Sequence, residues 1–220
     1  MQVMTSDLAY LSASMFDLAE SYLGKPNVVV SSMHENWLKD RCDALLKEAE
    51  SINSSTSPFG FLCIVALIAY LGELTFGNIT KSVGQKQKSD FASDNKNYFC
   101  RFMRERMSRE KRKYDTVCGD VYQQVRNGLA HCMMLFDQRS SQIKIAISHD
   151  EKYSAGVERG KVGPLKTEKI NGRRVTVLNA KDLISDIRYA LDGLFADAGM
   201  KRRMVEYSRN HPPIIGVCAS

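Results

Sequence analysis

The stretch 59–76, FGFLCIVALIAYLGELTF, decides the fold, because it is apolar on every side of a helix. Its uncharged part ends before Glu73, and 59–72 is only 14 residues long, short of the roughly 20 that cross a bilayer. A helix of this kind is typical of the centre of a helical protein. Small residues that let neighbouring helices approach closely are spread along it: Gly60, Ala66, Ala69 and Gly72. We therefore expect a central buried helix and no membrane partner.

Helical periodicity continues on both sides of this stretch. Further helices are expected over 5–23, about 35–52, about 91–107, about 114–136 and 180–199. The segment GKPNVVVSS, 24–32, is expected to separate the first two. In the helix 114–136, apolar residues repeat at three and four positions and form its core stripe: Val117, Val121, Val125, Leu129, Cys132 and Met133.

Between the last two helices the period changes from helical to alternating. QIKIAIS (142–148) and RRVTVLN (173–179) read as strands, and we expect them to pair antiparallel. The 24 residues between them are too many for a tight turn, so we expect a mobile excursion there.

The fold class expected from these elements is mainly α. It is an up-and-down bundle of about five to six helices, with a small two-stranded antiparallel β-ribbon inserted before the last long helix. The expected organisation is an N-terminal short helix and linker (1–30), a helical domain (31–210) with the ribbon at about 140–180, and a tail (211–220) that Pro212 and Pro213 make irregular.

Positive charge is concentrated in one segment. Residues 81–113 hold 11 Lys and Arg against 4 Asp and Glu, a net of +7, whereas the whole chain has +6 and the remainder therefore −1. Such a block suits a polyanion such as RNA, and a solvated helix face is the alternative. The candidate RNA-binding residues are Arg101, Arg104, Arg109, Lys111, Arg112 and Lys113.

Several classes of site have no sequence signal. The 6 cysteines form no CxxC pair and read as reduced thiols of a cytoplasmic protein. The 4 histidines are widely spread, and neither a P-loop nor a dinucleotide-binding motif is present. The N-terminus has no positively charged region ahead of an apolar run, which argues against a secretory signal. We expect no metal and no cofactor.

The run VRNGLAHCMMLF, 125–136, carries three polar residues that lie off the core stripe: Arg126, Asn127 and His131. In an α-helix, Asn127 and His131 would lie roughly 40° apart and Arg126 about 140° from His131. The asparagine would then orient the imidazole, while the arginine would reach around or act on a phosphate shared with a second protomer. An ion-paired arginine and a half-buried core histidine are the structural alternative.

RNGLAH on the penultimate long helix of an all-α bundle resembles the motif of the HEPN superfamily. This resemblance implies a four- to five-helix bundle that dimerises, with two motifs facing one another in a basic cleft that holds RNA. It also implies a metal-independent endoribonuclease acting as a toxin or defence effector, with an antitoxin or other protein partner.

Elementary chemistry agrees with such roles. Imidazole titrates near neutral pH and suits His131 as the acid/base. A guanidinium can grip two oxygens of a phosphorane-like transition state, which suits Arg126. A non-catalytic module of the same fold, binding a nucleotide, RNA or a protein and dimerising, stays open as the alternative.

Overall fold

The computed structural model describes residues 27–53, 58–78, 88–128, 143–158 and 161–210. The chain divides into two compact units, residues 1–39 and 40–220. In the first unit the described part is the beginning of α2 (Asn27–Asn53). The expected helix at 5–23 and the irregular tail at 211–220 lie outside the described residues.

Helix α2 corrects one expectation and confirms another. It covers the predicted helix 35–52, but it already begins at Asn27, so the expected break over 24–32 is wrong for residues 27–32. The three valines there are β-branched, which lowers helix propensity by only about 0.7 kcal/mol or less each, so they do not end a helix by themselves.

Helix α3 (Pro58–Phe76) is the centre of the second unit, as predicted. It contacts α4 (Lys88–Phe102), α7 (Ala180–Ala196), α8 (Ala198–Asn210) and the π-helix η3 (Val121–Asn127). Its buried apolar side chains face all of these neighbours: Phe61, Ile64, Val65, Leu67, Ile68, Leu71 and Leu74. Across the described ranges, no helix has the length and apolar character that a membrane crossing requires.

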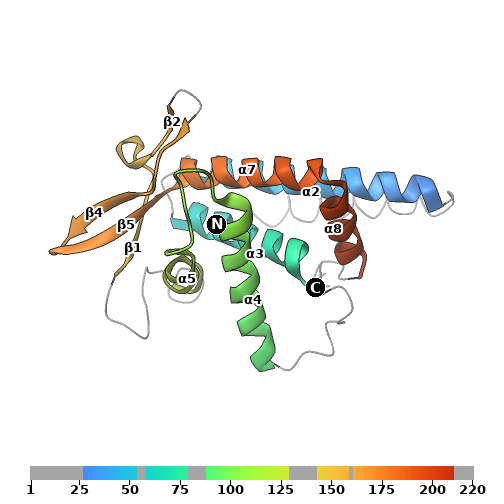
Figure 1. The fold of residues 1–220 in the computed structure, drawn as a ribbon, viewed down its shortest axis with the longest axis horizontal. Coiled ribbons are helices and arrows are strands. Elements are labelled where there is room, and N and C mark those ends of the chain that lie inside the picture. The colour runs from blue at the N-terminus through green and yellow to red at the C-terminus, as the bar shows by residue number, and fades with distance from the viewer. Residues whose placement is uncertain (1–26, 54–57, 79–87, 129–142, 159–160, 211–220) are drawn as a thin grey trace, which may run out of the picture. The chain divides into compact units, whose positions relative to one another are not determined.

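The close approach predicted for small residues of α3 occurs at Gly72. A Cβ atom there would lie 2.7 Å from the backbone oxygen of Tyr98, so only glycine lets α4 come this near. Ala66, by contrast, is exposed. Figure 1 shows α3 and α4 as neighbours in the second unit.

Both helices that were expected to carry basic or polar site residues contain π-helical turns. Helix α4 continues as η2 (Met103–Met107), and together they match the predicted helix 91–107. The predicted helix 114–136 begins later, as α5 (Cys118–Asp120), and continues as η3. Val117, Val121 and Val125 are buried, which confirms this part of the core stripe. The rest of it, Leu129, Cys132 and Met133, lies outside the described residues.

The predicted antiparallel ribbon is wrong. Strand β1 (Ile145–Ser148) pairs with β5 (Arg173–Asn179) in parallel, with Ile145 opposite Thr176, and the antiparallel partner of β5 is β4 (Lys166–Ile170). The sheet order is therefore β1-β5-β4. The long connection that was expected to be an excursion is what permits parallel pairing, because a parallel neighbour needs a crossover.

That connection holds ordered structure. It contains the 3-10 helix η4 (Glu151–Tyr153) and a second, two-stranded sheet of β2 (Val157–Glu158) and β3 (Lys161–Val162) before β4 begins. Strand β5 then leads directly into α7, whose N-terminus is capped by the Asn179 side chain, which accepts a hydrogen bond from the Lys181 backbone N–H.

Helix α7 confirms most of the predicted helix 180–199, and α8 was not predicted. Leu183, Ile187, Leu191 and Leu194 of α7 are buried. A new helix starts after Asp197, whose carboxylate accepts hydrogen bonds from two backbone N–H groups of the next turn. The described architecture is thus mainly helical with a small mixed sheet.

Candidate functional site

Arg126 and Asn127, two of the three predicted catalytic residues, contact each other through their side chains. Arg126 Nη1 donates to Asn127 Oδ1 over 3.0 Å, and Asn127 Nδ2 donates to Gln123 Oε1 over 3.2 Å. The guanidinium carbon of Arg126 lies 5.4 Å from the centroid of the Tyr122 ring. The third residue, His131, lies outside the described residues.

These contacts hold the guanidinium in place, and within the described part of the chain they leave N–H donors of the group unused. Arg126 and Asn127 are half-buried, and contacts among the described residues use one of the five guanidinium N–H groups, the one that donates to Asn127. The remaining donors suffice for a bidentate contact with an oxyanion such as phosphate. A planar cation held between an aromatic ring and an amide is therefore presented at the edge of the core.

The π-helical form of η3 alters the predicted geometry. The angles of 40° and 140° assumed α-helical turns, whereas Val121–Asn127 follow the wider π-helix. Because His131 lies outside the described residues, the angles themselves stay a prediction. π-Helical turns are rare and occur frequently at functional sites.

The six predicted RNA-binding residues fall into two groups. Arg101, Arg104, Lys111 and Lys113 are exposed. Arg101 is already paired with Glu105, its Nε 2.8 Å from Oε1, and its guanidinium lies 4.1 Å from the Phe76 ring centroid. Arg109 and Arg112 belong to a different structure, a buried ion-pair network.

Arg112 is the centre of this network and is 0% exposed. Its guanidinium contacts two carboxylates of α7: Nη1 lies 3.0 Å from Asp186 Oδ2, and Nη2 lies 3.2 Å from Asp182 Oδ1. Its Nε and Nη2 also donate to the backbone oxygens of Gly163 and Gly156. Each of the three guanidinium nitrogens therefore has a hydrogen-bond or ion-pair partner. A buried charge requires such partners, because it has lost its contact with water.

Tyr114 and Arg109 complete the network around Asp186. The Tyr114 hydroxyl donates to Asp186 Oδ2 over 2.7 Å. Arg109 Nε lies 2.9 Å from Asp186 Oδ1 as an ion pair without hydrogen-bond alignment, and Arg109 Nη2 donates to the Ser185 backbone oxygen. Burial raises the pKa of Asp186, against the opposing effect of Arg112, and burial together with Asp186 raises the pKa of Tyr114.

The network gives Arg109 and Arg112, two of the predicted RNA-binding residues, carboxylate partners within the protein. Their guanidinium groups pair with carboxylates of α7 and so hold the segment that follows η2 against this helix. A count of charges along the sequence misses this, because the partners lie about 70 residues further on. The available signal was Asp182 and Asp186, two carboxylates one helical turn apart on the apolar face of α7.

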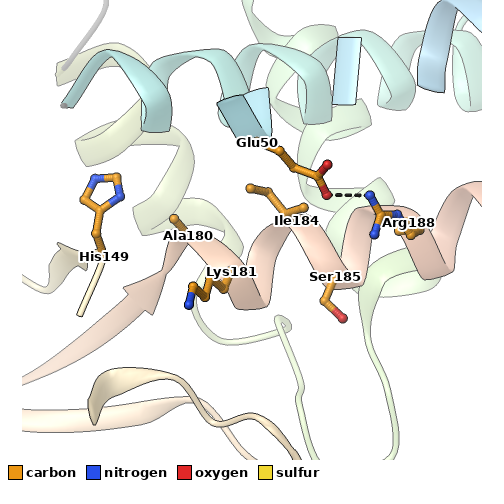
Figure 2. Close-up of a pocket in the computed structure, with 7 residues that line it drawn as sticks. All are labelled: Glu50, His149, Ala180, Lys181, Ile184, Ser185 and Arg188. Carbon is orange, nitrogen blue, oxygen red and sulfur yellow. Dashed lines mark hydrogen bonds and ion pairs between the residues drawn. The ribbon is translucent and has the colours of Figure 1, made fainter. Parts of the chain in front are cut away.

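A second site, which sequence reasoning missed, is a hollow of about 390 Å³ beside His149 (Figure 2). The His149 ring stacks edge-on against Phe61, with centroids 5.0 Å apart and planes at 79°. Its Nδ1 is buried and has no hydrogen-bond partner within the described part of the chain. Nothing in the sequence distinguishes this histidine from the others, because it follows a short strand without a motif.

The charges around the hollow are already balanced. It is lined by Glu50, His149, Ala180, Lys181, Ile184, Ser185 and Arg188. Figure 2 shows Glu50 and Arg188 as an ion pair, and Lys181 pairs with Glu151. Lys181 and Arg188 of this lining therefore each have a carboxylate partner.

Among the residues that the structure describes, no group of three or more His, Cys, Asp or Glu side chains is placed to hold a metal ion. Comparison of the chain with protein-family models, with curated proteins and with solved structures finds no match.

Proposed function

We propose that the chain is a HEPN-type, metal-independent endoribonuclease. The observation that supports this most directly is the Arg126–Asn127 contact on the π-helical turns of η3, which positions a guanidinium at a half-buried site. The proposed frame is an up-and-down helical bundle whose two protomers bring their motifs together. A role as a toxin or defence effector, restrained by an antitoxin or another protein, belongs to the same proposal.

The reaction requires one acid/base and one oxyanion clamp. In this proposal His131 removes the proton of a ribose 2′-hydroxyl, and the 2′-oxygen attacks the adjacent phosphorus. The bond from phosphorus to the 5′-oxygen breaks, and the imidazolium of His131 returns its proton to that leaving oxygen. A 2′,3′-cyclic phosphate and a 5′-hydroxyl result. Arg126 holds the two non-bridging oxygens as negative charge develops on them.

The exposed cations of the basic segment supply the non-specific part of RNA binding in this proposal. Arg104, Lys111 and Lys113 are exposed beside the helical core, as is Arg101 despite its pairing with Glu105. Phosphate contacts of this kind give affinity that falls as salt concentration rises.

The test is cleavage of total RNA by the purified chain in the presence of EDTA. Arg126→Ala and His131→Ala should each lower the cleavage rate by about 10²-fold or more, because each removes a group acting in the transition state. His149→Ala and Arg202→Ala are matched controls, since they remove the same residue types elsewhere. Equal cleavage by all four variants would exclude this site.

The second candidate is a non-catalytic module of the same fold that binds RNA, a nucleotide or a protein. The contacts of Arg126 with Asn127 and Tyr122 favour it, because they also satisfy a purely structural arginine. Binding of RNA without cleavage, equal in wild type and Arg126→Ala, would select this candidate. Light scattering after size exclusion tests the dimer that both candidates share.

A further inference from the structure

We propose that the hairpin formed by β4 and β5 is a basic arm that binds the groove of an RNA stem through its phosphates. This choice of polyanion rests on the proposed function, whereas the arm itself is defined by its own geometry. The arm comprises residues 166–174, and every one of them is exposed.

A tight turn gives the arm a fixed shape. Asn171 and Gly172 have φ angles of 50° and 77° and link Ile170 to its partner Arg173. Two such residues form a two-residue turn whose twist matches the strands that flank it. The arm is therefore a rigid two-stranded ribbon, and Figure 1 shows β4 and β5 extending beyond the start of α7.

The arm carries a strong excess of positive charge. Lys166, Lys169, Arg173 and Arg174 stand against Glu168 alone, a net of +3 from four cations and one anion. Glu168 accepts a hydrogen bond from the Tyr153 hydroxyl over 3.0 Å. Within the described residues, none of the four cationic side chains makes an ion pair or a hydrogen bond, so all four are open to a partner.

Two of these cations oppose each other in the ladder. Lys169 lies directly across from Arg174, and like charges in this position repel. Neither side chain contributes to the core, because both are exposed. The arrangement weakens the free hairpin, and an anion bound between the two side chains relieves the repulsion.

The four cations are distributed over both faces of the arm, and this distribution favours an RNA groove over a flat surface. Because side chains alternate along a strand, Lys169 and Arg174 lie on one face, while Lys166 and Arg173 lie on the other with Ile170. A membrane or an acidic helix would meet only one face. The groove of an RNA stem presents phosphates on both of its walls, so it engages all four cations at once.

The test measures fluorescence anisotropy of a labelled RNA stem-loop over a range of salt concentrations. It uses the Arg126→Ala chain, so that cleavage does not interfere. The arm variant is Lys169→Gln, Arg173→Gln and Arg174→Gln together. The matched control is Lys47→Gln, Arg202→Gln and Arg209→Gln, which removes the same charge from exposed positions of α2 and α8.

The arm variant should bind about 10-fold or more weaker than its parent, and the slope of log affinity against log salt should become shallower by roughly 2.7, as expected when about three phosphate contacts with a duplex are lost. The control should change both quantities much less. Equal losses in the two variants, or no loss in the arm variant, would overturn the proposal. So would loss of binding to anionic phospholipid vesicles with RNA binding retained.

The two proposals fail separately. If the chain with Arg126 intact does not cleave RNA but the arm variant still loses stem binding, the endoribonuclease proposal falls and the arm stands. If the chain cleaves RNA and the arm variant binds the stem as its parent does, the arm falls and the endoribonuclease proposal stands. Circular dichroism of the arm variant confirms that its fold is unchanged.

Discussion

The guanidinium of Arg112 and the carboxylate of Asp186 form an ion pair in which Nη1 and Oδ2 lie 3.0 Å apart and both residues are 0% exposed. The pair joins the segment after η2 to the middle of α7. Removing one partner of such a pair leaves the other charge buried without compensation, which costs more than the intact pair contributes.

Asp186→Asn tests this relationship. The substitution keeps the shape of the side chain but removes the ion pair of Arg109 and leaves Arg112 with Asp182 as its remaining carboxylate partner. We expect the free energy of unfolding to fall by about 3–5 kcal/mol, measured by urea denaturation. Asp192→Asn, at an exposed position of the same helix, should change it by about 0.5 kcal/mol or less. Similar values for the two variants would contradict the network.

Gln124 links η3 to β1. Its side-chain oxygen accepts hydrogen bonds from the backbone N–H groups of Lys144 and Ile145, both over 3.0 Å, and the side chain is buried. Gln124→Met keeps the length but removes the acceptor, so both amides lose their partner. We expect a loss of about 2 kcal/mol in the free energy of unfolding and faster hydrogen exchange at these two amides.

Lys144→Met provides the control for this prediction. It removes the exposed ion pair with Asp120 but keeps the backbone amide. Its effect should stay below about 1 kcal/mol. An equally large effect would assign the stability to the lysine side chain instead of the buried glutamine.

Replacing Gly172 or Gly193 with alanine should change the free energy of unfolding in opposite directions. Gly172 has a φ of 77°, and a Cβ there would meet nothing within 4 Å, so the cost of Gly172→Ala is backbone strain alone. We expect a loss of about 1–2 kcal/mol. Gly193 lies inside α7, also in open space, so Gly193→Ala should raise the free energy of unfolding by about 0.5–1 kcal/mol. The midpoint of thermal denaturation should fall in Gly172→Ala and rise in Gly193→Ala. A shift in the same direction for both variants would contradict the positive φ angle at Gly172.

The surroundings of Cys118 predict that its thiol ionises near neutral pH and that folding stability depends on this ionisation. A hydrogen bond from the Cys100 thiol, aided by Arg104 and the Gly119 N–H, lowers the pKa of Cys118 to about 7. A depressed pKa means that thiolate formation stabilises the folded state above the pKa of the unfolded thiol. This contribution is lost as the pH falls through about 7. The ultraviolet absorbance of the thiolate should therefore show a transition near this pH.

Three variants identify the group responsible. Cys118→Ala should abolish the transition, and Cys100→Ala should move it to higher pH because the donor is lost. Cys63→Ala is the control, because burial raises the pKa of that thiol out of the range. A transition that survives in Cys118→Ala would show that another group titrates.

Local patterns predicted the helical part of the fold well. The apolar run of α3 and the three- and four-residue repeat of Val117, Val121 and Val125 correspond to buried faces. This works because the period of a helix is set by its own backbone, and burial follows from that period. The Asn171-Gly172 turn was an equally local signal for the β4–β5 hairpin. It was passed over because 173–179 was paired with 142–148, and the residues of β4 were expected to belong to the mobile excursion.

The sequence by itself determined the helical class, the central position of α3 and the adjacency of Arg126 and Asn127, since each depends on neighbours along the chain. Only the tertiary structure decided that β1 and β5 run parallel and that Arg112 is buried between Asp182 and Asp186. The physical reason is distance along the chain. Whether a charge meets phosphate or a carboxylate depends on residues about 70 positions away, and the packing of α7 brings them together.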